Sequence, residues 1–313
     1  MSVTREDVIW AYRMILGREP ESEAAIEHKI ARLQSRKELR RALLCSKEFV
    51  GTASPVELEN SQNFLKTERA ESLSPTVIHL HIPKTAGTSL NEKLAENYAS
   101  RPKWSYHDQN ITKFFELTPE ERSHLDLIFG HMDYGIHEYI PREHVYLFVL
   151  RKPIDRIYSY YNYVGKNKEH PLFGKVKTGP ENFGKFLRQS MSRSEIQKEI
   201  NNSQARRIAG DYDKQELSPS DCLKKACHIS FAPNVHFGLT EDFGEYLQRL
   251  HKLGHVAQTS EIQRNALNSQ SSLEKALEGL SSQESEILKD YTLIDDKLYK
   301  SCHEFIEFNK NKK

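Results

Sequence analysis

The stretch that decides the fold is residues 77–90, which read VIHLHIPKTAGTSL. Its first half is an apolar run rich in β-branched residues, which is typical of a buried strand. A loop of Pro, Lys, Gly and hydroxyl residues follows, and Leu90 and Leu94 then begin a helical pattern. The order strand, polar loop, helix points backbone N–H groups and the positive end of a helix at one place. The stretch therefore predicts a site for a phosphate-like anion.

The loop offers further donors to such an anion. Lys84 adds a point charge, and the residues after it offer backbone N–H groups or hydroxyls: Thr85, Ala86, Gly87, Thr88 and Ser89. Gly87 would let the backbone approach a ligand closely. The order differs from the Walker A loop of ATPases and GTPases, in which Lys follows the last Gly. No metal is expected, because no carboxylate cluster lies beside the loop; the bland alternative is a plain turn with a surface Lys.

Composition limits the class of protein. With 28% charged and 37% hydrophobic residues in a chain of 313, we expect a soluble globular protein. A net charge of +1 gives no general attraction to nucleic acid or to an anionic membrane. The charged N-terminus does not resemble a signal peptide and no run of about 20 apolar residues occurs, so we expect a cytoplasmic location. Of the 4 cysteines, Cys222 and Cys227 lie close together in the sequence, with His228 beside them. They could bind a metal or form a redox pair, or they could be two small apolar residues of one helix.

The pattern along the chain predicts a small helical module, a linker and a main domain. Residues 8–50 carry apolar residues at helical spacing in three runs, which predicts three short helices over residues 1–52. Periodicity weakens over residues 53–75, where Ser, Glu, Asn and Pro dominate, so this stretch is interpreted as a linker with one short helix near residues 63–71. The main domain then covers residues 76–313.

Three β-rich runs lead into polar segments and then into helical patterns. They are residues 77–82, 125–129 and 145–150, and together they predict an α/β fold with a central parallel sheet. Ligands of such sheets lie beyond the carboxyl ends of the strands. Lys84, His131 and Arg151 each follow one of these ends, so we expect them at one edge of the sheet. The last seventy residues predict helices that pack on the sheet.

A second anchor begins at Arg151, in the sequence RKPIDRIYS. Pro153 suits the first turn of a helix, which leaves Arg151 just outside it and Ser159 about two turns in. A guanidinium and a hydroxyl placed this way can reach one phosphate from different sides. The alternative is an Arg that ends a strand and a Ser that packs against a neighbour.

Together these segments resemble sulfotransferases that use 3′-phosphoadenosine-5′-phosphosulfate (PAPS) as donor. The loop resembles their 5′-phosphosulfate loop, and residues 151–161 resemble their 3′-phosphate motif, with Lys152 where the family commonly has Asp. Residues 202–210 and 235–243 resemble two segments of the carbohydrate type, which includes heparan sulfate 2-O-sulfotransferase. The resemblance implies a P-loop-like three-layer fold, and sulfuryl transfer to a hydroxyl of a carbohydrate or glycan-bearing acceptor.

The resemblance also implies roles for the residues. Lys84 would neutralise charge on the leaving phosphate, the loop would bind the 5′-phosphate, and Arg151 and Ser159 would hold the 3′-phosphate. His131, in the segment Gly130-His131, matches the catalytic histidine of the heparan type and has a pKa suited to a base. His81, His107 and His137 compete for that role. Asn202, Gln204 and Arg206 face the adenosine or an anionic acceptor, or else belong to a capped helix with a surface Arg.

The N-terminal module resembles a second family. The phrase YRMILGREP at residues 12–20, followed by SKEF at residues 46–49, is similar to the DUF4214 type of helical domain, which often accompanies bacterial enzymes of surface-glycan assembly. The resemblance implies docking or targeting, and the alternative is a stabilising helical cap.

Two other functions stay open beside sulfuryl transfer. An ATP-dependent P-loop-like kinase would need an Asp to hold Mg²⁺ and a Lys after the loop Gly, and neither arrangement is clear. In a non-catalytic glycan-binding scaffold the nucleotide site would have lost its function. The presence of Lys84, Arg151 and Ser159 together disfavours this alternative.

Overall fold

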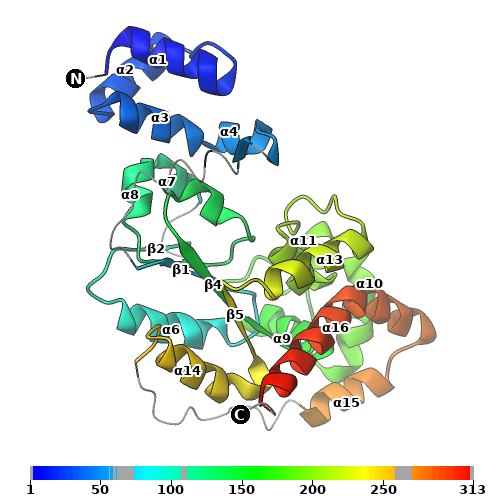
Figure 1. Ribbon diagram of the computed structural model, residues 1–313. Coiled ribbons are helices and arrows are strands. Elements are labelled where there is room, and N and C mark those ends of the chain that lie inside the picture. Colours follow the sequence, from blue (N-terminus) through cyan, green and yellow to red (C-terminus); the bar gives the residue numbers. More distant parts are fainter. Residues whose placement is uncertain are drawn as a thin grey trace. The chain divides into compact units, whose positions relative to one another are not determined.

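The computed structural model describes residues 3–55, 57–58, 61, 74–106, 111–257 and 270–310. Its centre is a five-stranded parallel sheet in the order β2-β3-β1-β4-β5 (Figure 1). The strands are β1 (Thr76–Leu80), β2 (Lys103–Ser105), β3 (Leu127–Gly130), β4 (His144–Leu150) and β5 (Val235–Leu239). The predicted fold class, α/β with a central parallel sheet, is confirmed.

The strand predictions succeed where the apolar run is continuous. Every residue of β1 and β3 is buried, as expected for strands that are covered on both faces. Strand β2 is missing from the sequence analysis, because its three residues follow Pro102 and are too few to show a period. Its partner is β3, with Trp104 opposite Ile128.

The chain divides into two compact units that do not follow chain order. Unit 1 comprises residues 1–78, 100–130 and 135–145, and unit 2 comprises residues 79–99, 131–134 and 146–313. The predicted boundaries at residues 52 and 75 stay a prediction. The short helix predicted near residues 63–71 lies outside the described residues.

The N-terminal part of unit 1 contains four α-helices rather than the three expected. The third apolar run is interrupted at Cys45 and Ser46, so that it forms two helices. The elements are α1 (Arg5–Ala11), the π-helical turn η1 (Tyr12–Leu16), α2 (Glu23–Arg32), α3 (Arg36–Leu44) and α4 (Lys47–Thr52). Each α-helix begins at a Ser or Thr whose hydroxyl accepts a backbone N–H, namely Thr4, Ser22, Ser35 and Ser46.

The two phrases that suggested a known module meet in the structure. Gly17 ends η1 with φ 66°, a conformation that favours glycine. Arg18 donates two hydrogen bonds to the carboxylate of Glu48, and its guanidinium lies 5.2 Å from the ring of Tyr12. Ser46 caps α4 by accepting the N–H of Phe49 at 3.1 Å. These contacts favour a stabilising role for the phrases.

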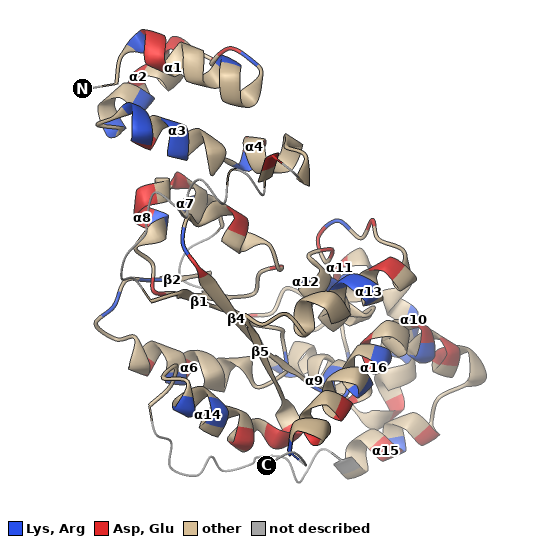
Figure 2. Cartoon of the chain, in the orientation of Figure 1, with Lys and Arg blue, Asp and Glu red and all other residues tan. Residues whose placement is uncertain are grey.

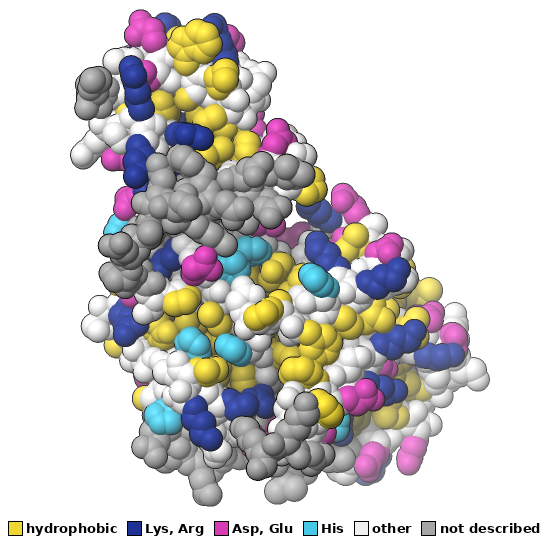
Figure 3. Space-filling view, viewed as in Figure 1, with side chains coloured by type: hydrophobic (Ala, Val, Ile, Leu, Met, Phe, Trp, Pro, Cys, Tyr) yellow, Lys and Arg dark blue, Asp and Glu magenta, His cyan; other side chains and the backbone are white. Residues whose placement is uncertain are grey.

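Not every apolar residue of these helices is buried. Trp10 and Met14 are 60% and 77% exposed, and Figure 3 shows apolar side chains at the surface of the N-terminal helices. Figure 2 shows that Lys and Arg residues alternate with Asp and Glu residues along most helices. This agrees with a net charge near zero.

The rest of unit 1 adds short helices. They are α7 (Ile111–Glu116), α8 (Pro119–Ser123) and the 3₁₀ turn η2 (Ile136–Tyr139). Helix α8 begins with a capping box, in which the Thr118 hydroxyl accepts the Glu121 N–H and the Glu121 carboxylate accepts the Thr118 N–H.

Unit 2 carries the longer helices. They are α6 (Gly87–Asn97), α9 (Pro153–Lys166), α10 (Phe183–Ser190), α11 (Ser194–Ile200), α12 (Ser203–Ala209), α13 (Pro219–Ser230), α14 (Phe243–Lys252), α15 (Gln270–Glu278) and α16 (Ser282–Lys310), with 3₁₀ turns η3 (Pro180–Asn182) and η4 (Thr240–Asp242). Cys222 and Cys227 both lie on α13. No group of three metal-ligating side chains occurs among the described residues.

The prediction that the last helices pack on the sheet is only partly right. Helix α14 contacts β5, and the Phe305 ring of α16 lies 5.8 Å from the Phe237 ring of β5, but most of α16 packs on α9, α10, α12 and α13. An aromatic and aliphatic cluster that includes Tyr161, Phe183, Phe186 and Leu288 fills this region. The apolar spacing of α16 shows that one face is buried, but it cannot show which neighbour covers that face.

The cap of α4 gives a first prediction. Ser46→Ala should lower the free energy of unfolding by about 1 kcal/mol, because the Phe49 N–H loses its acceptor. The control is Ser285→Ala, an exposed position within α16, where Ala is at least as good a helix former. Urea denaturation of the full chain, followed by circular dichroism, measures both. Equal effects of the two substitutions would contradict the capping role.

Candidate functional site

The loop between β1 and α6 is held in an unusual backbone conformation. Lys84 and Ala86 have φ of 69° and 65°, a region that side chains other than glycine adopt at a cost. The fully buried Thr85 donates its hydroxyl to the Ile82 carbonyl at 2.8 Å. Arg156, also fully buried, donates to the Pro83 carbonyl at 3.5 Å. The loop is therefore fixed from within the fold.

Helix α6 begins where this loop ends. Ala86 is its N-cap and provides no side-chain hydrogen bond. The N–H groups of the first turn have no partner one turn back in a helix, and the helix dipole makes this end positive. Thr88, in that turn, is exposed. The N-terminus of α6 thus has the chemistry of an anion site beside Lys84, as the sequence predicted.

The structure shows why position 87 requires a residue without a Cβ, which the sequence did not reveal. A Cβ at this position would lie 1.9 Å from Cδ2 of His81. The sequence analysis explained Gly87 by close approach of a ligand, whereas the structure shows a histidine ring against it. That ring also lies 4.3 Å from the ring of His131, measured between centroids.

His131 follows β3 directly, as predicted. Its Nδ1 donates to the carbonyl oxygen of His81 at 2.9 Å. Because a carbonyl only accepts, Nδ1 carries the proton of the neutral ring, and the basic lone pair is on Nε2. Asn91 orders the neighbouring imidazole by donating to Nδ1 of His81 at 3.2 Å. The geometry therefore gives His131 the tautomer of a base that acts through Nε2.

Arg151 follows β4 and lies next to the anion loop. Its guanidinium donates to the Lys84 carbonyl at 3.3 Å. Gln204 fixes its backbone, accepting the Arg151 N–H and donating to the Arg151 carbonyl, both at 3.0 Å. Ser159 lies in the second turn of α9, which begins at Pro153 as predicted, and is partly exposed. Both proposed phosphate ligands thus flank the start of α9.

The ammonium group of Lys84 has its own environment. It lies 4.2 Å from the centroid of the Tyr163 ring, on α9. Burial, and then the charge of Arg151, lower the pKa of Lys84. An anion at the loop would offset the repulsion between these two cations.

The three residues predicted as weak substrate contacts lie on and before α12. Asn202 accepts the backbone N–H groups of Ile294 and Asp295 in α16, at 2.8 and 3.2 Å. Gln204 holds Arg151, and Arg206 forms an ion pair with Asp211 in which both side chains are buried. These contacts give all three residues structural roles, but not the ones expected, because the Asn202 side chain does not cap α12 and Arg206 is buried rather than at the surface. A substrate contact stays a prediction.

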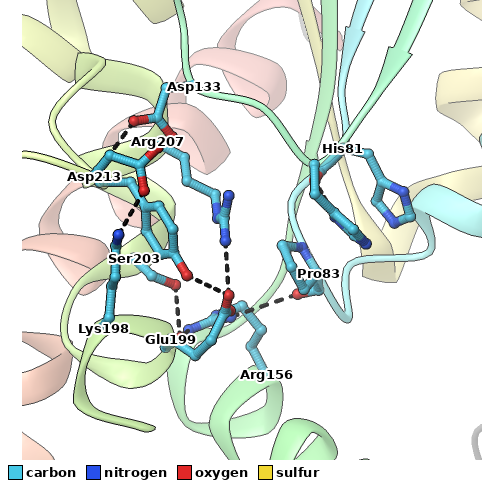
Figure 4. Close-up of polar contacts among 11 residues, drawn as sticks. His81, Pro83, Asp133, Arg156, Lys198, Glu199, Ser203, Arg207 and Asp213 are labelled. Atoms are coloured by element: carbon cyan, nitrogen blue, oxygen red, sulfur yellow. Dashed lines mark hydrogen bonds and ion pairs between the residues drawn. The ribbon is translucent and has the colours of Figure 1, made fainter. Parts of the chain in front are cut away.

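A buried charged cluster beside the site was not anticipated. Arg207 donates to the Glu199 carboxylate at 2.8 Å, Tyr212 donates to the same oxygen, and Arg156 donates to the Glu199 backbone carbonyl at 2.5 Å. Figure 4 shows both arginines directed at Glu199, near Pro83 and His81. Although burial acts in the opposite direction, Arg207 and then Tyr212 hold the pKa of Glu199 below its usual range. The carboxylate therefore stays charged close to the anion loop.

A second carboxyl of this cluster behaves differently. Burial raises the pKa of Asp133 to about 6, although the charge of Arg207 acts against it. Asp133 accepts the backbone N–H of Asp213 at 3.2 Å, and Asp213 pairs with Lys198 at 2.5 Å. The only sequence signal for the cluster was Arg156, which belongs to the motif at residues 151–161 but was given no role there.

The competing histidines can also be placed. His81 packs on Gly87 and His131, and is 5% exposed. The His137 ring lies against the His144 ring in unit 1, with centroids 4.3 Å apart and an angle of 34° between the ring planes. His107 lies outside the described residues.

The chain was compared with protein-family models, with curated proteins and with solved structures, and only the solved structures gave matches. No protein-family model matches the chain, and no curated protein matches it. Among solved structures that match is the crystal structure of mouse sulfotransferase SULT7A1 complexed with PAP, with 15% identity and a TM-score of 0.42, over 80% of this chain and 95% of that chain. At this TM-score the likeness carries no argument. In the described part of the chain, no helix is long and apolar enough to span a membrane.

The contact between Gly87 and His81 gives a second prediction. Gly87→Ala should lower the free energy of unfolding by about 1–3 kcal/mol, because the added Cβ displaces the His81 ring. Gly244→Ala, in the first turn of α14, is the control, since nothing lies within 4 Å of a Cβ there. Thermal and urea unfolding measure both variants. If the Gly87 variant is as stable as the Gly244 variant, the packing described here is wrong.

Proposed function

We propose that the chain is a PAPS-dependent sulfotransferase that moves a sulfuryl group to a hydroxyl of a carbohydrate or glycan-bearing acceptor. The observation that carries the proposal is the placement of Lys84, His131 and Arg151 around one short loop. Arg151 donates to the Lys84 carbonyl, and His131 donates to the His81 carbonyl. A cation, a base and a second phosphate ligand therefore belong to one site within unit 2.

The donor side of the site supports a nucleotide with two phosphate groups. The N-terminus of α6 and Lys84 suit the 5′-phosphosulfate, with N–H groups from the residues after Lys84. Arg151 and Ser159 are assigned to the 3′-phosphate, which distinguishes PAPS from ATP. Because Gln204 fixes the Arg151 backbone, its guanidinium is preorganised for a fixed anion.

The acceptor side supports His131 as the base. A neutral His131 has its lone pair on Nε2, since Nδ1 donates to the His81 carbonyl. In the reaction, His131 Nε2 takes the proton of the acceptor hydroxyl, and the hydroxyl oxygen attacks the sulfur of the PAPS sulfuryl group. The bond between sulfur and the bridging phosphate oxygen breaks, and Lys84 stabilises the charge left on that phosphate. Glu199 stays anionic nearby and favours the imidazolium that forms.

The carbohydrate acceptor rests on the resemblance of residues 202–210 and 235–243 to the carbohydrate type. The N-terminal module is proposed as a docking or targeting element, on the resemblance of residues 12–20 and 46–49 to the DUF4214 type. Acceptor-binding segments vary on a constant scaffold, so the acceptor itself needs experiment.

Nucleotide binding tests the donor assignment. Calorimetric titration should show binding of 3′-phosphoadenosine-5′-phosphate (PAP), with AMP much weaker. Arg151→Ala should weaken PAP about 10- to 100-fold, because a charge-assisted contact of roughly 1.5–3 kcal/mol is lost. Lys152→Ala is the matched control, as this exposed neighbour carries the same charge.

Other outcomes of the titration separate the alternatives. Binding of ATP with Mg²⁺ in preference to PAP would indicate a kinase. Binding of neither nucleotide would indicate a scaffold. Equal losses in the Arg151 and Lys152 variants would remove the specific role of Arg151.

Turnover tests the base. With an acceptor that the wild-type chain sulfates, His131→Ala should lower kcat about 10²- to 10⁴-fold, while PAP affinity changes little. Lys84→Ala should abolish transfer. His124→Ala, an exposed histidine at the end of α8, controls for loss of any imidazole. A His131 variant with unchanged kcat would rule out this residue as the base.

A further inference from the structure

Unit 1 contains a second cationic site, formed by residues other than those assigned to transfer. A cavity of ≈ 300 Å³ is lined by α2, α3, the start of α4 and residues 115–122. Four permanent or near-permanent cations line it: Lys29, Arg32, Lys47 and Arg122. Glu116 is the one carboxylate among the described lining residues. The wall therefore carries an excess of positive charge.

Arg122 is the most unusual of these cations. It is 3% exposed, and its Nε has no hydrogen-bond partner among the described residues. Its Nη1 donates to the Cys45 carbonyl at 3.1 Å, and the guanidinium lies 5.6 Å from the Phe114 ring. Burial raises the pKa of the Cys45 thiol to about 11, so this thiol supplies no negative charge. A buried cation is normally offset by an anion.

Lys29 is a second cation of the cavity wall that is partly removed from water. Burial lowers its pKa, and Arg32 and Arg122 act in the same direction against Glu21. Arg32 is already engaged with the Glu116 carbonyl at 3.2 Å and the Glu121 carboxylate at 3.4 Å. Cations that lie close together in a partly buried site repel one another, and a bound anion reduces this repulsion.

The remaining wall indicates the size and nature of that anion. Leu33, Phe115 and Leu117 give apolar surface, and Ser46 and Thr118 give hydroxyls. Ligand cavities generally measure about 300–1,000 Å³, so this one suits a ligand near the small end. Several cations can share the three terminal oxygens of a phosphate or sulfate ester, whereas a carboxylate offers only two, and Arg pairs well with such oxyanions.

We propose that this cavity binds a monosaccharide-sized organic anion that carries a phosphate or sulfate ester. Its oxyanion lies among Lys29, Arg32 and Arg122, and its body lies against the apolar wall. The site is formed jointly by the N-terminal helices and α8, which gives those helices a binding role. The inference does not depend on the proposed transfer reaction.

The test uses the full chain and three probes, namely glucose 6-phosphate, glucose 6-sulfate and glucose. Calorimetry or chemical-shift titration should detect the two esters and not glucose. Lys29→Ala should weaken ester binding tenfold or more, and Lys47→Ala, an exposed position at the same cavity, should weaken it less. Lys37→Ala is the control, an exposed lysine of α3 that does not line the cavity.

Two further arms keep the result unambiguous. Ester binding should persist in Arg151→Ala, which separates this cavity from the nucleotide site. Thermal unfolding of each variant shows whether it is folded, and the Lys47 variant serves if the Lys29 variant is not. Absence of ester binding, equal binding of glucose, or loss through Arg151→Ala but not through the cavity variants would overturn the proposal. The ratio of the two ester affinities then tells phosphate from sulfate.

Discussion

Four consecutive carbonyl groups of the anion loop accept hydrogen bonds from side chains, and the candidate site depends on these bonds. The donors are His131 to His81, Thr85 to Ile82, Arg156 to Pro83 and Arg151 to Lys84. In a trans peptide the N–H points opposite to the carbonyl. The N–H groups of Lys84 and Thr85 therefore point away from these donors, toward the side on which the proposed anion would bind. The four hydrogen bonds themselves help to offset the cost of the positive φ angles at Lys84 and Ala86.

Two of the four donors, Arg151 and His131, are also residues that the proposal assigns to the reaction. Arg151 and His131 each use one hydrogen-bond donor to hold the loop, and the proposal assigns to both a second role in binding or catalysis. Gln204 and Asp295 extend the support, since Asp295 of α16 accepts the N–H groups of Ala205 and Gln204 at 2.8 and 3.3 Å. The long C-terminal helix thus stabilises the helix that holds Arg151. Residues far apart in sequence fix the geometry of one short loop.

Local sequence was enough for the strands, the loop and the start of α9, because apolar runs, Pro153 and the Lys and Gly of the loop act through neighbouring residues. It was not enough for tertiary partners. The reason for Gly87 is a histidine ring, the role of Gln204 is a clamp on Arg151, and α16 packs on helices. Strand β2 has only 3 residues, which are too few to show a hydrophobic period in the sequence. Side-chain bonds between distant segments leave no periodic signal in the sequence.

The most direct measurement is the chemical reactivity of Lys84, read by peptide mass spectrometry after brief acetylation near neutral pH. Burial and Arg151 lower the pKa of Lys84, so it should be acetylated more readily than an ordinary lysine with equal access. The account predicts that PAP protects Lys84 strongly and that adenosine does not, while exposed Lys224 reacts equally in all samples. Acetylation of Lys84 at the same rate with and without saturating PAP would contradict the assignment of this loop as the nucleotide site.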